Sequence, residues 1–202
     1  MSQLPFSQAC ENNKAPILEV LRHSFASVTR VLEIGSGTGQ HGVYFSAALP
    51  HINWQCSDMG NLAALNARLA LEGRGRLSKA LVLDVSGPWP ALEVDGIFSA
   101  NTLHIMDRAS VECFFAGAGR VLGATGQLCI YGPFNYGGDY TSASNRDFDA
   151  WLKARDSVSG IRDIEWVLQL ADAAGFALMQ DHAMPANNRL LHLTKVSKDS
   201  QG

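Results

Sequence analysis

The chain has 202 residues, of which 47% are hydrophobic and 17% are charged, and a formal net charge of -3 at pH 7. This length and apolar fraction suit one α/β domain with a sizeable core, and two domains are not expected. The 16 Lys and Arg residues are scattered along an acidic chain, so we expect no nucleic-acid partner.

Cysteine usage and hydropathy indicate the compartment. The cysteines at positions 10, 56, 113 and 129 show no C-x-x-C spacing, which favours free thiols over a disulfide framework or a metal site. No segment approaches the roughly 18 apolar residues that span a bilayer, and the first residues lack a basic start followed by an apolar stretch. The sequence therefore predicts a cytoplasmic protein with no membrane partner and no metal.

The first 28 residues are expected to form an N-terminal arm and a helix. Residues 1–15 are polar, and Pro16 suits the first turn of a helix that continues through Phe25. The arm is either a solvated extension or a lid that folds over a ligand.

Residues 29–198 are expected to form a single domain in which strands and helices alternate. Apolar runs predict strands at 30–34, 51–56, 80–85, 94–101 and 126–134, and amphipathic runs predict helices at 40–48, 61–71 and 109–122. Strands that are apolar along their whole length are typical of a parallel sheet covered by helices.

A polar, glycine-rich insert at about residues 132–162 is longer than most loops of a compact domain. Helices are expected at 146–155 and 163–174, and strands at 176–184 and 189–196. The short turn Pro185-Ala-Asn-Asn188 joins these strands as a hairpin, so the last strand is expected to be antiparallel.

The most informative stretch is Val31-Leu-Glu-Ile-Gly35-Ser-Gly37-Thr-Gly39, which leads from a predicted strand into a helix. Alternating glycines allow positive φ angles and let a ligand approach the backbone. The free N–H groups at the start of the next helix attract a negatively charged group. A G-x-G-x-x-G dinucleotide fingerprint that starts where the strand ends would need a glycine at position 40, but this chain has Gln40 there. The pattern acidic-x-Gly-x-Gly-x-Gly is complete at Glu33, Gly35, Gly37 and Gly39.

Polar residues end the neighbouring predicted strands. Asp58 follows the glycines at close to the roughly 20 residues at which nucleotide folds place an acid on ribose hydroxyls. Because ligands of open α/β sheets bind outside the carboxyl ends of the strands, Gly35, Asp58, Asp84 and Asn101 are expected to meet in one crevice. A helix N-cap for Asp58 and a turn for Asp84 are the alternatives. Glu33, inside an apolar strand, needs a cationic or N–H partner.

The glycine pattern resembles motif I of the class I S-adenosylmethionine (SAM) methyltransferases, and the order of elements resembles their sheet. The resemblance implies a Rossmann-like α/β sandwich with a seven-stranded, mostly parallel sheet, an antiparallel last strand and helices on both faces. It implies SAM as cofactor, with Glu33 and the glycine loop on its amino-acid moiety and Asp58 on both ribose hydroxyls. Met59 would pack on adenine, and Asp84 and the Val85 backbone would meet the adenine edge.

Further segments, spread over nearly the whole chain, resemble the small methyltransferase-like family that includes the human methyltransferase-like protein 26. They are Asn13-Lys14-x-Pro16-Ile17-Leu18, Gly132-Pro-Phe134, Thr141-Ser142-x-Ser144-Asn145 with Phe148-Asp149, Gly160-Ile-Arg-Asp163 and Met184-Pro-Ala-Asn-Asn188. No substrate transfers from this family.

Methyl transfer from a sulfonium needs acceptor, methyl and sulfur aligned in a dry site, and a base only if the acceptor loses a proton. His104, just beyond the fourth predicted strand, is the candidate base, although a lone loop histidine is often structural. Tyr131 is a candidate for orienting the acceptor, and Asn101 for holding cofactor or substrate.

We expect the insert and the arm to enclose a pocket for one small polar or anionic molecule. Arg146, Arg155 and Arg162 are candidates for an anion clamp, because guanidinium groups pair bidentately with carboxylate or phosphate. Asn13 and Lys14 of the arm would lie above the substrate. The other interpretation of the arginines is surface charge.

The sequence thus predicts a SAM-dependent methyltransferase for a small polar or anionic molecule, as a monomer or homodimer. One alternative is a nicotinamide-dependent oxidoreductase, which Gln40 in the frame of the third glycine disfavours. The other is a non-catalytic SAM-fold binding protein, which the intact motifs disfavour.

Overall fold

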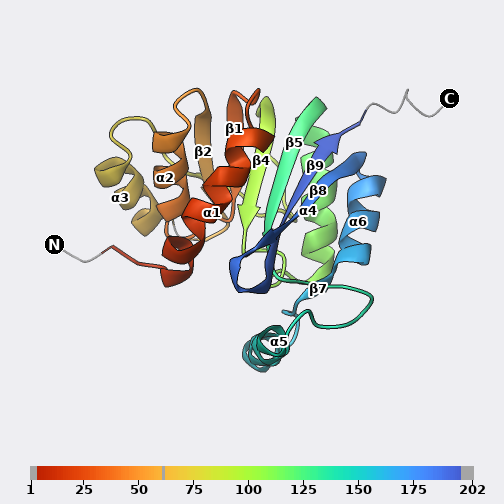
Figure 1. Cartoon of the computed structure of the whole chain (residues 1–202). Coiled ribbons are helices and arrows are strands. Elements are labelled where there is room, and N and C mark those ends of the chain that lie inside the picture. Colours follow the sequence, from red (N-terminus) through yellow and green to blue (C-terminus); the bar gives the residue numbers. More distant parts are fainter. Residues whose placement is uncertain (1–3, 61, 197–202) are drawn as a thin grey trace.

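A seven-stranded sheet forms the centre of the computed structural model, which describes residues 4–60 and 62–196 (Figure 1). Its strands are β1 (Arg30–Ile34), β2 (Asn53–Asp58), β3 (Leu81–Val82), β4 (Val94–Ala100), β5 (Leu122–Gly132), β8 (Phe176–Met184) and β9 (Asn188–Lys195). They lie in the order β3-β2-β1-β4-β5-β9-β8. β9 runs antiparallel to both neighbours, and the pairs from β3 to β5 are parallel. This arrangement confirms the predicted fold class.

Helices cover both faces of the sheet. One face carries α1 (Gln8–Ser24), α2 (Gln40–Ala48) and α3 (Ala63–Glu72), and the other carries α4 (Arg108–Val121) and α6 (Ile164–Ala173). Successive side chains of a strand point to opposite faces. Val31 and Phe98 therefore pack under α1 and α2, whereas Leu32 and Ile97 pack under α4 and α6.

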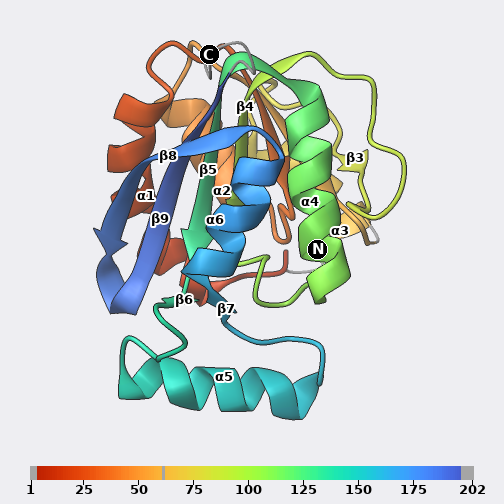
Figure 2. The same cartoon turned by 90° about the vertical axis from the view of Figure 1, so that its right-hand side faces the viewer.

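The insert lies beyond the carboxyl ends of the parallel strands. Figure 2 shows its helix α5 (Ala143–Arg155) standing off from the end of the sheet. Two short strands, β6 (Phe134–Asn135) and β7 (Arg162–Asp163), pair with each other, so the insert leaves and returns at one place. The buried carboxylate of Asp149 ties it together by accepting from Tyr140 Oη at 2.7 Å, Lys153 Nζ at 2.6 Å and Ile161 N at 2.7 Å. The insert is thus an ordered platform.

The sequence-based expectation for the first helix was wrong. Pro16 lies in the middle of α1, not in its first turn, because the helix begins at Gln8 with Ser7 as its N-cap. The Ser7 hydroxyl accepts from Cys10 N at 3.3 Å, which satisfies one of the free N–H groups of the first turn. Asn12 and Asn13 gave this stretch its irregular, polar character, and both line a cavity. Their polarity therefore belongs to the wall of this cavity and not to an irregular arm.

The third strand is shorter than expected. Of the predicted run at 80–85, Leu81 and Val82 pair with β2 at the edge of the sheet, and Leu83 N donates to Asp58 O at 3.0 Å before the chain turns at Asp84. The turn Pro185-Ala-Asn-Asn188 contains the short helix η1 (Pro185–Asn187), and β8 and β9 pair as the expected hairpin. No helix in the described residues is long and apolar enough to cross a membrane.

Candidate functional site

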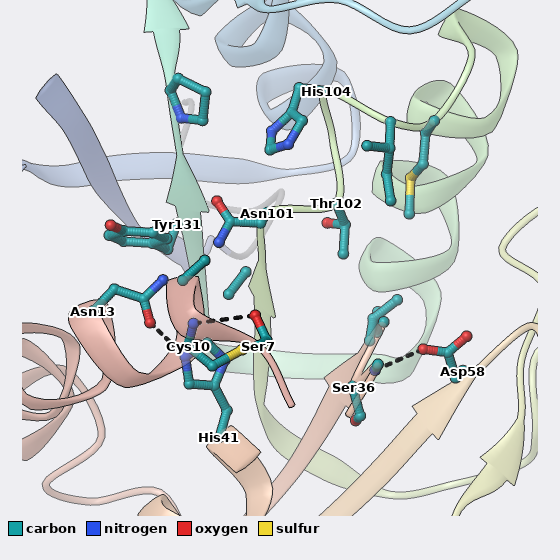
Figure 3. Close-up of a pocket in the computed structure, with 18 of the residues that line it drawn as sticks. Ser7, Cys10, Asn13, Ser36, His41, Asp58, Asn101, Thr102, His104 and Tyr131 are labelled. Atoms are coloured by element: carbon teal, nitrogen blue, oxygen red, sulfur yellow. Dashed lines mark hydrogen bonds between the residues drawn. The ribbon is translucent and has the colours of Figure 1, made fainter. Parts of the chain in front are cut away.

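A cavity of about 1010 Å³ opens at the carboxyl ends of β1, β2, β4 and β5 (Figure 3). The glycine loop, the start of α1, the loop after β4 and the insert also line it. β1 lies between β2 and β4, the point at which strand order reverses in such a sheet and where ligands bind. Ligand pockets usually measure about 300–1,000 Å³, so this cavity lies at the upper end of that range.

Glycine is required in the loop after β1 for two different reasons. Gly35 has φ +73°, and a Cβ there would lie 2.4 Å from Thr102 Cγ2, so the chain passes too close to the β4 loop for any side chain. Gly37 has φ +53°, and a Cβ there would meet nothing within 4 Å. Gly37 lines the cavity, and its backbone is open to a ligand. Gly39 is the N-cap of α2 beneath Leu65 and is not among the lining residues.

The two acids at the strand ends face the same cavity. Asp58 Oδ2 accepts from Gly37 N at 2.8 Å, which joins the end of β2 to the glycine loop. The N-cap of α3 is Leu62, so Asp58 is not a helix cap. Asp84 Oδ1 accepts from Ser86 N at 2.9 Å, so Asp84 forms the alternative strand-end turn while also lining the cavity.

Met59 and Val85 complete the predicted cofactor side. Both line the cavity, Met59 with 71% of its surface exposed and Val85 with its side chain buried. All the predicted cofactor residues except Glu33 and Gly39 therefore lie around one space.

Glu33 is buried behind the site and does not line the cavity. Its carboxylate accepts from Trp54 Nε1 at 2.9 Å, the N–H partner that burial of an acid requires, and from Cys56 Sγ at 3.4 Å. Burial raises the pKa of Glu33, and these hydrogen bonds oppose the rise. The side chain therefore braces β1 against β2 from the α2 face.

A polar pair and a tyrosine form the wall next to α1. Asn13 Oδ1 lies 2.7 Å from His41 Nε2, as Figure 3 shows, and both residues line the cavity together with Tyr131. Burial lowers the pKa of His41 to about 4, so the ring is neutral at pH 7 and its Nε2–H is the donor. Burial raises the pKa of Tyr131. His41 was missed from the sequence, although it follows the glycine loop in the first turn of α2.

Asn101 and His104 face the cavity from the loop after β4 (Figure 3). Asn101 has φ +59°, a left-handed backbone that asparagine tolerates and that clusters at functional sites. The ring of His104 lies edge-on to Phe148 of α5, at 5.4 Å between centroids. Neither ring nitrogen has a hydrogen-bond partner within the part of the chain that the structure describes. Burial and the charge of Arg162 lower the pKa of His104 to about 4.

The cationic residues that were predicted to bind substrate make their contacts elsewhere, and none of them lines the cavity. Lys14 Nζ lies 2.5 Å from Glu11 Oε2, Arg146 is an exposed neighbour of Asp147, and Arg155 lies over Trp151 at 5.5 Å. Arg162 is buried among backbone carbonyls.

The charge of the cavity wall follows from this placement. Among the described lining residues there is no Lys or Arg, whereas four aspartates, at positions 58, 84, 107 and 156, take part. The described residues also hold no cluster of three or more His, Cys, Asp or Glu side chains that suits a metal ion. The wall is therefore neutral to acidic.

A comparison with models of protein families shows the family of this chain. The family model described as "Protein of unknown function (DUF938)" matches residues 4–195, nearly the full length. The chain belongs to this family. The matched range includes every described residue that lines the cavity.

Solved structures show the fold of this DUF938 member independently. An O-methyltransferase family protein from Burkholderia thailandensis superposes with TM-score 0.80 at 17% identity, covering 92% of this chain and 57% of that one. An O-methyltransferase family 2 protein from Planctomyces limnophilus, complexed with apigenin, gives 0.79 at 18% identity, covering 93% and 58%. A third, an O-methyltransferase of neocarzinostatin biosynthesis in complex with SAM and 2-hydroxy-5-methyl naphthoic acid, gives 0.76 at 18%, covering 93% and 55%.

These likenesses establish a class I methyltransferase fold for the DUF938 chain. The chain spans a little over half the length of the solved structures that it matches.

The buried histidines predict how stability depends on pH. For His104 the folded-state pKa is about 4 and the ordinary value 6.5, so between these values the unfolded state binds a proton that the folded state does not. Stability is fully present above pH 6.5 and is lost as the pH falls, by about 1.4 kcal/mol per pH unit for each such histidine. When the free energy of unfolding is measured with urea at several pH values, that of His104→Gln is expected to fall less steeply with decreasing pH than that of wild type. The control is His23→Gln, which replaces an exposed histidine. Equal slopes in wild type and His104→Gln would contradict the assignment.

Proposed function

We propose that this DUF938 member is a SAM-dependent methyltransferase that acts on a small molecule. The observation that carries the proposal is the composition of one cavity. The glycine loop and Asp58 line one side of it, and Asn101, His104 and Tyr131 line the other. A methyltransferase needs such an arrangement because cofactor and acceptor must meet in line.

The cofactor side fits SAM in shape and chemistry. Gly37 offers an open backbone, and Asp58 offers two carboxylate oxygens at the distance along the chain that suits ribose hydroxyls. Leu83 and Val85 supply an apolar wall beside Asp84, as an adenine ring with a polar edge requires. The acidic wall also suits a ligand that carries a sulfonium cation. We assign the cofactor role to these residues, with Met59 covering the adenine.

Beyond a site for SAM, methyl transfer needs few catalytic groups from the protein. When bound, SAM supplies a methyl group on sulfur and its own leaving group. Asn101 and Tyr131 would orient the acceptor by hydrogen bonds. His104, neutral at pH 7 and with both ring nitrogens free of partners in the described residues, would take a proton from a hydroxyl acceptor.

The lining of the cavity favours a polar, uncharged acceptor over an anionic one. An anionic acceptor would lie against a wall that holds aspartates and, among its described residues, no lysine or arginine. No cation would then replace the hydration that the anion loses. The predicted anion clamp of arginines therefore has no support in the geometry. Polar groups without charge, such as Asn145 and Asn188, line the same end together with Phe148.

The resemblance to the small methyltransferase-like family stays a proposal, supported by where its segments lie. Asn13, Pro133, Asn145, Phe148 and Asn188 belong to four of those segments, and all of them line the cavity. The segments are distant in sequence, so their meeting at the acceptor end favours a shared substrate pocket. The cytoplasmic location and the monomer or homodimer are proposals as well.

The start of α1 has the position of a lid, which we also propose. Ser7 N donates to Gln40 Oε1 at 2.6 Å, and Gln40 Nε2 donates to Glu11 Oε1 at 2.7 Å. Arg68 Nη2 donates to Pro5 O at 2.6 Å, so the segment ahead of the helix is held as well. Gln40, the residue that interrupts the dinucleotide fingerprint, thus holds the lid beside the glycine loop.

Thermal-shift titration separates the cofactor classes. S-adenosylhomocysteine (SAH) and SAM are expected to raise the melting temperature, because a ligand at 1,000 times its Kd stabilises by about 4 kcal/mol. NAD and NADP are expected to leave it unchanged at the same concentrations. Stabilisation by NAD or NADP alone would favour the oxidoreductase, and no shift with any of the four would contradict the proposal.

A further inference from the structure

We propose that Arg162 is a positioning residue that holds the His104 loop against the insert, so that the imidazole faces the acceptor end of the cavity. The inference rests on the proposed function only for the role of His104. Arg162 was expected from the sequence to bind an anionic substrate, and the structure places it behind the cavity wall.

The guanidinium bridges two segments that are distant in the sequence. Its Nε donates to Leu103 O at 3.1 Å, and its Nη2 donates to Met106 O and to Val158 O, the latter at 2.9 Å. Leu103 and Met106 flank His104 on either side, and Val158 belongs to the insert. One side chain therefore fixes both ends of the short loop that carries the imidazole.

The insert also bonds the loop between those two points. Gly160 N donates to His104 O at 2.8 Å, and Ser159 Oγ donates to Ile105 O at 3.3 Å. The four consecutive carbonyls from Leu103 to Met106 thus all accept from the segment 159–162. These four carbonyls are therefore all satisfied by the insert, while the His104 ring lines the cavity.

A buried arginine without an acidic partner is unusual, and this gives Arg162 its significance. Within the described residues no carboxylate oxygen lies within 4.0 Å of its guanidinium. Burying such a charge is costly unless hydrogen bonds replace its hydration, and here backbone carbonyls do so. Arginine suits the place because its planar fork reaches several acceptors at once, whereas a lysine ammonium is a single point.

The charge of Arg162, which Asp149 and Asp107 offset only from beyond ion-pair distance, also acts on His104. A positive charge beside the ring disfavours the imidazolium, and with burial it keeps the pKa of His104 low. Tyr131, Asp107 and Asp156 are the other titratable groups around this part of the cavity. Arg162 therefore keeps the ring in place and keeps it neutral.

The test separates the two effects by titrating the His104 ring by NMR and by following amide hydrogen exchange at Gly160. In Arg162→Met we expect Gly160 to exchange at least about tenfold faster than in wild type. We also expect the pKa of His104 to rise toward 6.5. In Arg162→Lys we expect the faster exchange with the low pKa largely kept, since the charge remains. The control is Arg155→Met, which removes an exposed arginine of the same insert.

Unchanged exchange at Gly160 and an unchanged His104 pKa in Arg162→Met would overturn the proposal. If that variant does not fold, Arg162→Lys decides by its Gly160 exchange alone, and a wild-type rate there would overturn the proposal. SAH affinity, measured in parallel, is expected to stay within about threefold of wild type, because Asp58 and the glycine loop do not contact Arg162. Failure of wild type to bind SAH would overturn the proposed function while leaving both NMR readouts interpretable.

Discussion

Replacement of Asp58 by alanine is expected to weaken SAH binding by about 30- to 160-fold. This corresponds to about 2–3 kcal/mol, the loss of charge-assisted hydrogen bonds to the two ribose hydroxyls. The variant is expected to fold, because Asp58 lies half-exposed at the end of β2 and outside both apolar cores. Isothermal calorimetry with SAH measures the effect.

The matched control for Asp58→Ala is Asp156→Ala. Asp156 lines the same cavity and carries the same charge, but it follows α5 at the acceptor end. We expect its loss to change SAH affinity by no more than about threefold. An unchanged affinity in Asp58→Ala, or equal losses in both variants, would remove Asp58 from the cofactor site.

Replacement of Gly37 by valine is expected to abolish SAH binding, with affinity falling by more than about 100-fold. The valine side chain would extend into the open space where the backbone faces the cavity, and its β-branch would strain the left-handed conformation at φ +53°. Strain of this kind costs about 1–2 kcal/mol of stability. Calorimetry gives the affinity, and urea unfolding gives the stability.

Gly75→Val separates strain from the blocked site. Gly75 has φ +74° and, like Gly37, open space around a Cβ, but it lies in the turn after α3 and not among the residues that line the cavity. Both variants are expected to lose similar stability, and only Gly37→Val is expected to lose SAH. A folded Gly37→Val with normal affinity would show that the glycine loop does not touch the ligand.

Local patterns predicted the centre of this fold well. The strand at 30–34, the helix at 40–48 and the strand at 176–184 have the bounds that the sequence indicated. In each case the residues that decide the structure are neighbours in the chain: an apolar run, a glycine turn, or a short hairpin connection. The seven-stranded sheet itself was implied by the resemblance to the class I methyltransferases, which the chain order of these units carried.

Errors arose where a residue's environment is set by distant segments. Asn13 looked like part of a polar arm, yet it lies in a helix and accepts a hydrogen bond from His41 in the same wall of the cavity. The sequence suggested that Glu33 contacts the cofactor, and the structure places its carboxylate against Trp54 and outside the lining of the cavity. Neither partner could be found from local sequence, since each lies more than 20 residues away.

The arginines of the insert show the same difficulty with charge. An arginine in a polar loop is usually solvated or binds a ligand, and nothing near Arg162 in the sequence indicates burial. Its acceptors are carbonyls of Leu103 and Met106, which only the packing of the insert brings close. The sequence therefore gives the net charge of the chain, but it did not predict which charged side chains line the cavity.

Transfer of label from SAM is the most direct test of methyltransferase activity. Wild type and Asp58→Ala are incubated with methyl-labelled SAM and a total small-molecule extract of cells, and the products are separated by size and charge. We expect wild type to place label on an uncharged small molecule, and Asp58→Ala to place far less there. Label that stays in SAM with wild type, or that appears in protein or nucleic acid instead, would contradict the account.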